Sequence, residues 1–236
     1  MLVLGIDTAG AAGSVALVAD GHVLASLYVR TLPARARPVL RTIDLILNWL
    51  DHEISDLTGL AVNIGPGAFT GIRVGFALAQ GLALASDKPL FGYSAFDALV
   101  TLAPEWEGVM CPVLEARKGE VYAAFYRRQD QVLRQTSSGM VLKPEDLCAL
   151  VTERTLFLGS GVRAYAATFA SMLGEQAICR STGMEEAGLA ICLARLGSTH
   201  LRTGASESLS PLAPLYIRPA DARIPPHIER TVEEKV

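Results

Sequence analysis

Residues 65–75 read Gly65-Pro66-Gly67-Ala68-Phe69-Thr70-Gly71-Ile72-Arg73-Val74-Gly75, a glycine-rich turn that runs into a helical pattern. Beyond this turn, small residues recur at every fourth position, at Gly71, Gly75, Ala79 and Ala83. Residues four apart lie on one face of an α-helix, so these four positions form a ridge without bulky side chains. Such a ridge predicts a helix that another backbone approaches closely.

Three interpretations fit this glycine-rich segment. As a phosphate loop, it would hold an anion through backbone N–H groups and the positive end of the helix. As an internal turn, its glycines would only provide backbone freedom and close helix-to-sheet packing. As an intermolecular surface, the ridge would receive a helix from another chain. The pattern G-x-x-x-x-G-K-[ST] is missing and the ridge continues for three turns, which favours the intermolecular surface.

Composition indicates a globular protein with a mild negative charge. The chain has 236 residues, of which 50% are hydrophobic, and its formal net charge is −3 with a pI of about 5.8. A chain of this size and apolarity can bury one large core or two smaller ones. It has no overall basic field that would attract nucleic acid, so we expect any such contact to be local or shared with a partner.

Cysteine usage and the apolar stretches favour a cytoplasmic location. The four cysteines are scattered without a C-x-x-C pair, which is typical of reduced thiols. Residues Met1–Asp7 lack the charged and long apolar regions of a signal peptide and are expected to form a strand. The most apolar stretch, Val74–Ser86, has 13 residues. A membrane span needs about 20, so we expect no membrane segment.

The first half of the chain predicts a three-stranded meander followed by alternating helices and strands. Strands are expected over residues 2–6, 14–19, 22–29, 60–64 and 89–93, with a tight turn at Asp20-Gly21. A helix is expected from Pro38, with an apolar stripe that comprises Val39, Leu40, Ile43, Ile46, Leu47 and Leu50. Thr70 is expected to cap the small-residue helix, and Ser94 with Asp97 forms a capping box for the next one.

The second half repeats this order, which predicts two similar lobes. Strands are expected over residues 109–114, 121–127, 132–135 and 155–158, with a turn at Asp130-Gln131. A helix is expected to start at Lys143-Pro144-Glu145, and two more to run over about 162–173 and 185–202. Gly159-Ser160-Gly161 corresponds to Gly65-Pro66-Gly67, and Glu115 ends its strand as Asp7 does. We therefore expect an N-terminal lobe over residues 1–103 and a C-terminal lobe over 104–210. An extended segment with a disordered charged tail should follow over 211–236.

Two α/β lobes of this kind, each with an acidic residue after its first strand, resemble the actin-like ATPase and sugar kinase superfamily, whose lobes are ribonuclease-H-like mixed sheets with helices. Within it, the chain resembles the TsaB (YeaZ) family. The resemblance rests on Asp7-Thr8, on residues 65–75, on Gln80-Gly81-Leu82-Ala83 and on residues 115–122. It covers residues 1–126 well and the rest weakly.

The resemblance implies a non-catalytic subunit for the tRNA modification threonylcarbamoyladenosine at adenosine 37, without a cofactor of its own. It implies pairing with a TsaD-like paralogue that holds the metal, and with a TsaE-like ATPase. A second copy of the chain is the alternative partner in isolation, and tRNA would be reached only through the complex. The implied partner interface comprises Val39, Ile43, Ile46, Leu47 and Leu50 on one helix and Gly71, Val74, Gly75, Leu78, Ala79 and Leu82 on the next.

An ATP-dependent phosphotransferase remains the alternative from another class, because superfamily members bind metal and phosphate at the position of Asp7 and Thr8. A vestigial nucleotide or anion loop would comprise Asp7, Thr8, Gly65, Gly67, Thr70 and Arg73. The loop after Asp7 carries no lysine, so a turn residue is the favoured role for this aspartate.

Other chemistries lack their residue patterns in this sequence. The four histidines are remote from one another and no G-x-S-x-G elbow occurs, so a metal site or a serine hydrolase is not expected. The arginines of residues 30–41 form one local basic cluster, at Arg30, Arg35, Arg37 and Arg41. They could contact tRNA phosphates or an acidic partner face, or simply be solvated.

Overall fold

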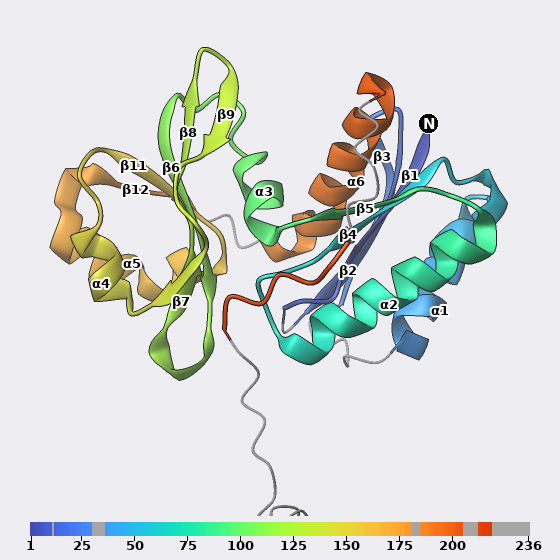
Figure 1. The fold of residues 1–236 in the computed structure, drawn as a ribbon, viewed down its shortest axis with the longest axis horizontal. Coiled ribbons are helices and arrows are strands. Elements are labelled where there is room, and N and C mark those ends of the chain that lie inside the picture. Colours follow the sequence, from blue (N-terminus) through green and yellow to red (C-terminus); the bar gives the residue numbers. More distant parts are fainter. Residues whose placement is uncertain (11, 30–35, 181–184, 205–211, 219–236) are drawn as a thin grey trace, which may run out of the picture.

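The computed structural model describes residues 1–10, 12–29, 36–180, 185–204 and 212–218. It has two α/β lobes side by side (Figure 1), which confirms the expected fold class. The N-terminal sheet has the strand order β3-β2-β1-β4-β5. Its strands are β1 (Leu2–Asp7), β2 (Gly13–Ala19), β3 (His22–Val29), β4 (Gly59–Asn63) and β5 (Leu90–Tyr93). Strand β1 runs antiparallel to β2 and parallel to β4.

The C-terminal sheet repeats this plan, with the main order β10-β7-β6-β11-β12 and with β8 and β9 extending it from β6. Its strands are β6 (Gly108–Glu115), β7 (Val121–Ala123), β8 (Tyr126–Gln129), β9 (Val132–Gln135), β10 (Met140–Leu142), β11 (Thr155–Leu158) and β12 (Ala177–Arg180). Strand β6 runs antiparallel to β7 and parallel to β11, as β1 does with β2 and β4. The expected duplication is therefore present in the topology.

Helices cover both faces of the N-terminal sheet. Helices α1 (Ala36–Trp49) and α2 (Phe69–Ser86) lie on one face, and α6 (Glu185–Thr203) lies on the other, with α3 (Ala95–Val100) between the lobes (Figure 1). Helices α4 (Pro144–Ala149) and α5 (Ser160–Leu173) pack on the C-terminal lobe. Short 3₁₀ turns occur at Ile54–Asp56, Arg117–Gly119 and Gly174–Gln176.

Helix α6 differs from the expectation that it completes the second lobe. It packs across β1, β2 and β4 of the N-terminal sheet, where Leu189 and Leu193 share a core with Val3. A β-carbon at Gly5 of β1 would lie 2.0 Å from the carbonyl oxygen of Ala190, so strand and helix backbones are in direct contact. The last helix in sequence thus returns to the first lobe, which sequence order does not reveal.

Local sequence signals account for most turns and helix ends. Asp20 and Gly21 have φ of 48° and 85°, and Asp130 and Gln131 have φ of 52° and 64°, so both predicted hairpin turns are confirmed. The capping box of α3 is also confirmed, because the backbone N–H of Asp97 donates to Ser94 Oγ at 3.0 Å. The predicted cap at Thr70 is wrong: α2 begins at Phe69, and Ala68 occupies the cap position without a side-chain hydrogen bond.

Helix α2 is a core helix of the N-terminal lobe. Judged by length and hydropathy alone, it is the one helix in the described part of the chain that could span a membrane. Its Ile72 and Phe76 are buried, and Ala79 and Ala83 belong to the core cluster of the N-terminal lobe. A third of the helix is buried, so burial against its own sheet accounts for only part of its apolar character.

Candidate functional site

The small-residue ridge of α2 packs against the chain's own first loop. A β-carbon at Gly71 would lie 2.0 Å from the carbonyl oxygen of Thr8, and one at Gly75 would lie 2.2 Å from Thr8 Oγ1. The Thr8 hydroxyl donates to the carbonyl oxygen of Gly71 at 2.7 Å. The prediction that Gly71, Gly75 and Ala79 form a docking surface is therefore wrong, and the internal interpretation of these glycines is the correct one.

Most of the predicted stripe on α1 is also internal. Val39, Ile43, Ile46 and Leu47 are buried in the core beneath the N-terminal sheet, so they cannot contact another chain. An amphipathic helix buries its apolar stripe against the nearest sheet, and here that sheet is the chain's own. Leu50, Val74, Leu78 and Leu82 are only partly buried.

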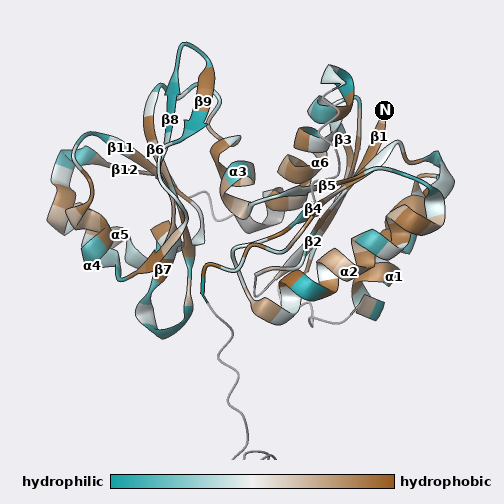
Figure 2. Cartoon of the chain, in the orientation of Figure 1, coloured by the Kyte–Doolittle hydropathy of each residue, from teal (hydrophilic) through white to brown (hydrophobic). Residues whose placement is uncertain are grey.

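A different set of apolar side chains on the same two helices faces solvent. Leu45 is 54% exposed, Trp49 76% and Leu84 87%. Figure 2 shows brown, hydrophobic segments on α1 and α2, with hydrophilic segments between them, along the outside of the N-terminal lobe. Sequence reasoning missed these residues because it assigned the regular apolar stripe to a partner, whereas the irregular apolar positions beside that stripe are the exposed ones. We call Leu45, Trp49 and Leu84 the outer apolar face.

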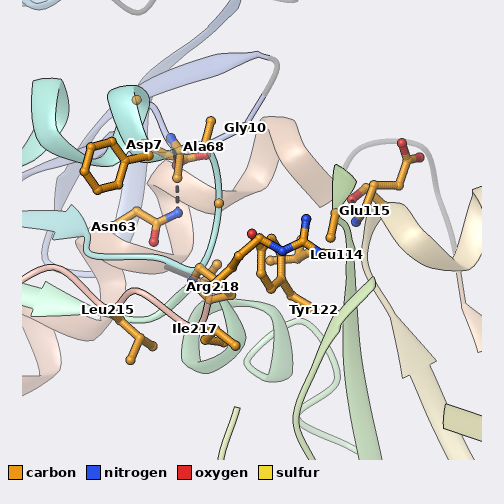
Figure 3. A pocket seen from close by; sticks show the side chains of 18 of the residues that line it. Asp7, Gly10, Asn63, Ala68, Leu114, Glu115, Tyr122, Leu215, Ile217 and Arg218 are labelled. Carbon is orange, nitrogen blue, oxygen red and sulfur yellow. Dashed lines mark hydrogen bonds between the residues drawn. The ribbon is translucent and has the colours of Figure 1, made fainter. Parts of the chain in front are cut away.

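A cleft of about 540 Å³ lies between the two lobes, at the carboxyl ends of β1 and β6. Asp7, Asn63, Gly67 and Thr70 line it from the N-terminal lobe. Glu115, Arg117, Tyr122 and Ser160 line it from the C-terminal lobe, and residues 215–218 line it from the C-terminal segment. Figure 3 shows Asp7 and Asn63 on one side, Glu115 and Tyr122 on the other, and Arg218 between them.

The carboxylate of Asp7 braces the loops around it. It is 3% exposed, and its Oδ1 accepts hydrogen bonds from the Ala9 backbone N–H at 3.0 Å and from Asn63 Nδ2 at 2.8 Å. Asn63 Oδ1 in turn accepts from the backbone N–H of Gly65 at 2.8 Å. Asp7 therefore ties the end of β1 to the end of β4 and to the glycine turn, in keeping with the turn role predicted from the sequence.

The residues of the predicted anion loop are only partly brought together. Asp7, Gly67 and Thr70 line the cleft, whereas Thr8 packs under α2. The guanidinium of Arg73 lies outside the cleft, 3.9 Å from the ring centre of Phe69, and its Nε donates to the Tyr216 hydroxyl at 3.0 Å. Arg117 and Arg218, which the sequence did not assign to the anion loop, are arginines that do line the cleft.

The second lobe presents a similar turn at the cleft. Gly159 has φ of 104° as Gly65 has φ of 120°, and both follow a parallel strand and precede a helix. Ser160 Oγ accepts from the backbone N–H of Glu115 at 3.2 Å. Glu115 is the last residue of β6 and lines the cleft, as Asp7 does at the end of β1. The two acidic residues that the sequence predicted at strand ends therefore face one cleft.

Among the described residues, no group of three histidine, cysteine or acidic side chains could hold a metal ion. Of the predicted arginine cluster, Arg37 and Arg41 are exposed on α1, while Arg30 and Arg35 lie outside the described residues. The thiols of Cys111, Cys148 and Cys192 are buried and that of Cys179 is exposed, and all four are free.

The two lobes and the cleft between them define a protein with the actin-like ATPase fold. The ROK hexokinase of Thermus thermophilus aligns with a TM-score of 0.54 and 10% identity over 84% of this chain and 99% of that chain, a likeness of fold alone. YeaZ from Pseudomonas aeruginosa aligns with a TM-score of 0.69 and 26% identity over 86% of this chain and 93% of that chain.

Sequence comparison narrows the class. Residues 34–222 match the family described as "TsaD: tRNA N6-adenosine threonylcarbamoyltransferase". The chain is 38% identical to the tRNA threonylcarbamoyladenosine biosynthesis protein TsaB of Escherichia coli, over 61% of this chain and 64% of that protein. It is 31% identical to TsaB of Haemophilus influenzae, over 70% of this chain and 75% of that protein. The chain therefore belongs to the TsaB (YeaZ) family, within the broader TsaD family.

Proposed function

We propose that this chain is a non-catalytic, cytoplasmic subunit of the machinery that makes threonylcarbamoyladenosine in tRNA. Its relatives from Escherichia coli and Haemophilus influenzae are named as biosynthesis proteins for this modification. The matched family is described as the threonylcarbamoyltransferase itself, so the catalytic partner would be a paralogue with the same fold. The role of this chain is to bind that paralogue and stabilise its competent conformation.

The outer apolar face carries this proposal. Trp49 and Leu84 are the two most exposed large hydrophobic side chains of the described residues, at 76% and 87%, and both lie near the C-terminal ends of their helices. Helices α1 and α2 are neighbours on the same side of the sheet. Burying a side chain of this size contributes about 1.5–3 kcal/mol, and exposed tryptophan is typical of binding hot spots.

The cleft supports a non-catalytic role. The Asp7 carboxylate accepts two hydrogen bonds from its own loops, and residues 215–218 occupy one wall of the cleft. The nearby Arg73 does not line the cleft, and its guanidinium lies over the rings of Phe69 and Tyr216, which do. These contacts use the groups that a phosphotransferase would direct at a nucleotide. A TsaE-like ATPase and tRNA would then be engaged only by the assembled complex.

Introduction of a negative charge on the outer apolar face tests the proposal. Trp49→Glu and Leu84→Glu should each weaken binding to the TsaD-type paralogue by about thirtyfold or more, because a hot spot contributes at least 2 kcal/mol. Met172→Glu on α5 is the matched control, since Met172 is 51% exposed on the other lobe. Equal affinity of all three variants, measured by titration calorimetry, would reject this surface.

A phosphotransferase is the second candidate, and the position of Asp7 at the cleft favours it. Titration of the isolated protein with magnesium ATP distinguishes the two functions. We expect no saturable binding at micromolar nucleotide. Micromolar affinity that disappears in Asp7→Asn would replace the subunit role with the enzyme.

A further inference from the structure

The C-terminal segment Leu212–Arg218 runs between the two lobes, where Figure 1 shows it as the red trace below β4 that ends near β7. Its two ends pack into different cores. Leu212 packs against the core of the N-terminal lobe, and Ile217 packs against the cluster around Met110 and Leu156 of the C-terminal lobe. We call residues 212–218 the strap.

The N-terminal lobe holds the strap through backbone contacts. The backbone N–H of Leu215 donates to the carbonyl oxygen of Ile64 at 2.7 Å, directly after β4. A β-carbon at Gly65 would lie 2.5 Å from the carbonyl oxygen of Leu215, and one at Gly92 would lie 2.5 Å from Leu212 Cδ2. Two glycines of this lobe therefore leave the space in which the strap lies.

Side chains at the start of α2 hold the middle of the strap. The ring of Tyr216 lies 4.9 Å from that of Phe69, centre to centre, and the Tyr216 hydroxyl accepts from Arg73 Nε at 3.0 Å. Since Arg73 also stacks on Phe69, the three side chains form one cluster. This cluster fixes the strap beside the mouth of the cleft.

The C-terminal lobe holds the other end of the strap. Arg218 forms an ion pair with Glu120, the residue before β7, and both side chains are largely buried at 18% and 28% exposure. A β-carbon at Gly139 would lie 2.6 Å from Ile217 Cδ1. The second lobe thus also leaves space for the strap and adds a charged anchor.

A separate contact between the lobes lies at α3. The Tyr126 hydroxyl of β8 donates to Asp97 Oδ1 at 2.8 Å, and Arg128 donates to the carbonyl oxygen of Ala103 at 2.9 Å. These bonds join the C-terminal sheet to α3 and to the residues just after it. Helix α3 also packs into a core on each side: Phe96 and Val100 share a cluster with Met110, and Leu99 shares one with Leu193. It is therefore the connection about which the lobes would turn, since lobes of one chain move relative to each other unless a large hydrophobic interface prevents it.

We propose that the strap is a latch that holds the two lobes at a fixed angle and so sets the width of the cleft. The α3 contact acts as the hinge. The strap supplies the second attachment point, because one of its ends is anchored in each lobe. The same residues form a wall of the cleft, so release of the strap would both open the cleft and remove that wall. The proposal concerns the isolated chain and does not depend on any partner.

The test measures the distance between the lobes by electron spin resonance. One label is placed on Cys179 of β12, the exposed native cysteine, and the other on Ser55→Cys, an exposed position in the N-terminal lobe. Ile217→Ser combined with Arg218→Ala removes the anchors of the strap in the C-terminal lobe. Gly139→Leu places a side chain of the C-terminal lobe in the space that Ile217 occupies. It therefore displaces Ile217 and leaves the strap sequence unchanged. Arg127→Ala is the control, because it breaks an arginine–glutamate pair with Glu153 inside one lobe.

Both strap variants should shift the interlobe distance by several ångströms and broaden its distribution, while Arg127→Ala keeps the narrow distribution of the unaltered protein. Folded strap variants that retain the original distribution would overturn the latch, even if their unfolding free energy fell, because the strap would then only stabilise the lobes. Failure of both strap variants to fold would also overturn it, since the strap would be part of the fold rather than a releasable latch.

Discussion

The carbonyl oxygen of Thr8 lies in the space that a side chain at Gly71 would occupy, 2.0 Å from an ideal β-carbon. This contact joins the loop after β1 to the first turn of α2. It explains why residue 71 is glycine without reference to any partner. The outward surface of α2 is formed by other residues, among them Leu84.

Two glycines of α2 should respond oppositely to alanine. Gly71→Ala should lower the free energy of unfolding by about 1–3 kcal/mol, because the added methyl group meets the rigid Thr8 backbone. Gly81→Ala should raise it by about 0.5–1 kcal/mol, since nothing lies within 4 Å of that position and alanine favours a helix. Urea unfolding measures both, and a stabilising Gly71→Ala would contradict the contact.

Asn63 should matter for stability through its two hydrogen bonds. Asn63→Ala removes the donor to Asp7 and the acceptor for Gly65, both buried, and should lower the free energy of unfolding by about 1–3 kcal/mol. Asn48→Ala, at an exposed position on α1, should change it by less than about 0.5 kcal/mol. Thermal and urea unfolding of the two variants provide the comparison. Similar losses of unfolding free energy in both would show that the hydrogen bonds of Asn63 contribute little.

The hydroxyl of Tyr126 should make stability fall at alkaline pH. Burial, followed by the neighbouring charge of Asp97, raises the pKa of this phenol above its ordinary value of 10.0. Because the pKa is higher in the folded state than in the unfolded state, the contribution of the Tyr126 hydroxyl to the free energy of unfolding is fully present below pH 10.0. It is lost as the pH rises through the folded-state pKa. The difference in unfolding free energy between the unaltered protein and Tyr126→Phe should therefore shrink above pH 10.0. A constant difference would contradict the assignment.

Native thiol labelling should select a single cysteine. Cys179 is exposed on β12, whereas Cys111, Cys148 and Cys192 are buried. Burial raises the pKa of all four thiols, so access of the reagent to the sulfur decides the order of reaction. A thiol reagent at neutral pH should therefore modify Cys179 first, and the other three only in denaturant. Peptide mapping after timed labelling identifies the site, and early modification of Cys111 would contradict this order.

Local signals in the sequence predicted the parts of the fold that depend on neighbouring residues. The turn at Asp20-Gly21 and the capping box of Ser94 and Asp97 were predictable because their hydrogen bonds close within a few residues. The repeated order of strands and helices similarly indicated two lobes. Thr70 failed as a cap because the helix starts at Phe69, two residues earlier than a cap at Thr70 requires.

Long-range packing could not be read from the same patterns. Four-residue spacing showed that something approaches α2 closely, but not that Thr8 of the same chain does so. The return of α6 to the first lobe and the attachment of Leu215 to Ile64 join segments about 130 to 190 residues apart, and periodicity carries no information at that range. Asp7 and Glu115 were predictable as cleft residues because the duplication placed both at strand ends.

The position of α6 also constrains how this protein is made. Val3 and Ala61 of the first sheet share their core with Leu193, which is synthesised more than 130 residues after Ala61. During translation one side of that sheet consequently stays uncovered until the ribosome has released almost the whole chain. A fragment that ends after the first hundred residues would expose the same apolar strands and should aggregate, so the N-terminal lobe matures last although it emerges first.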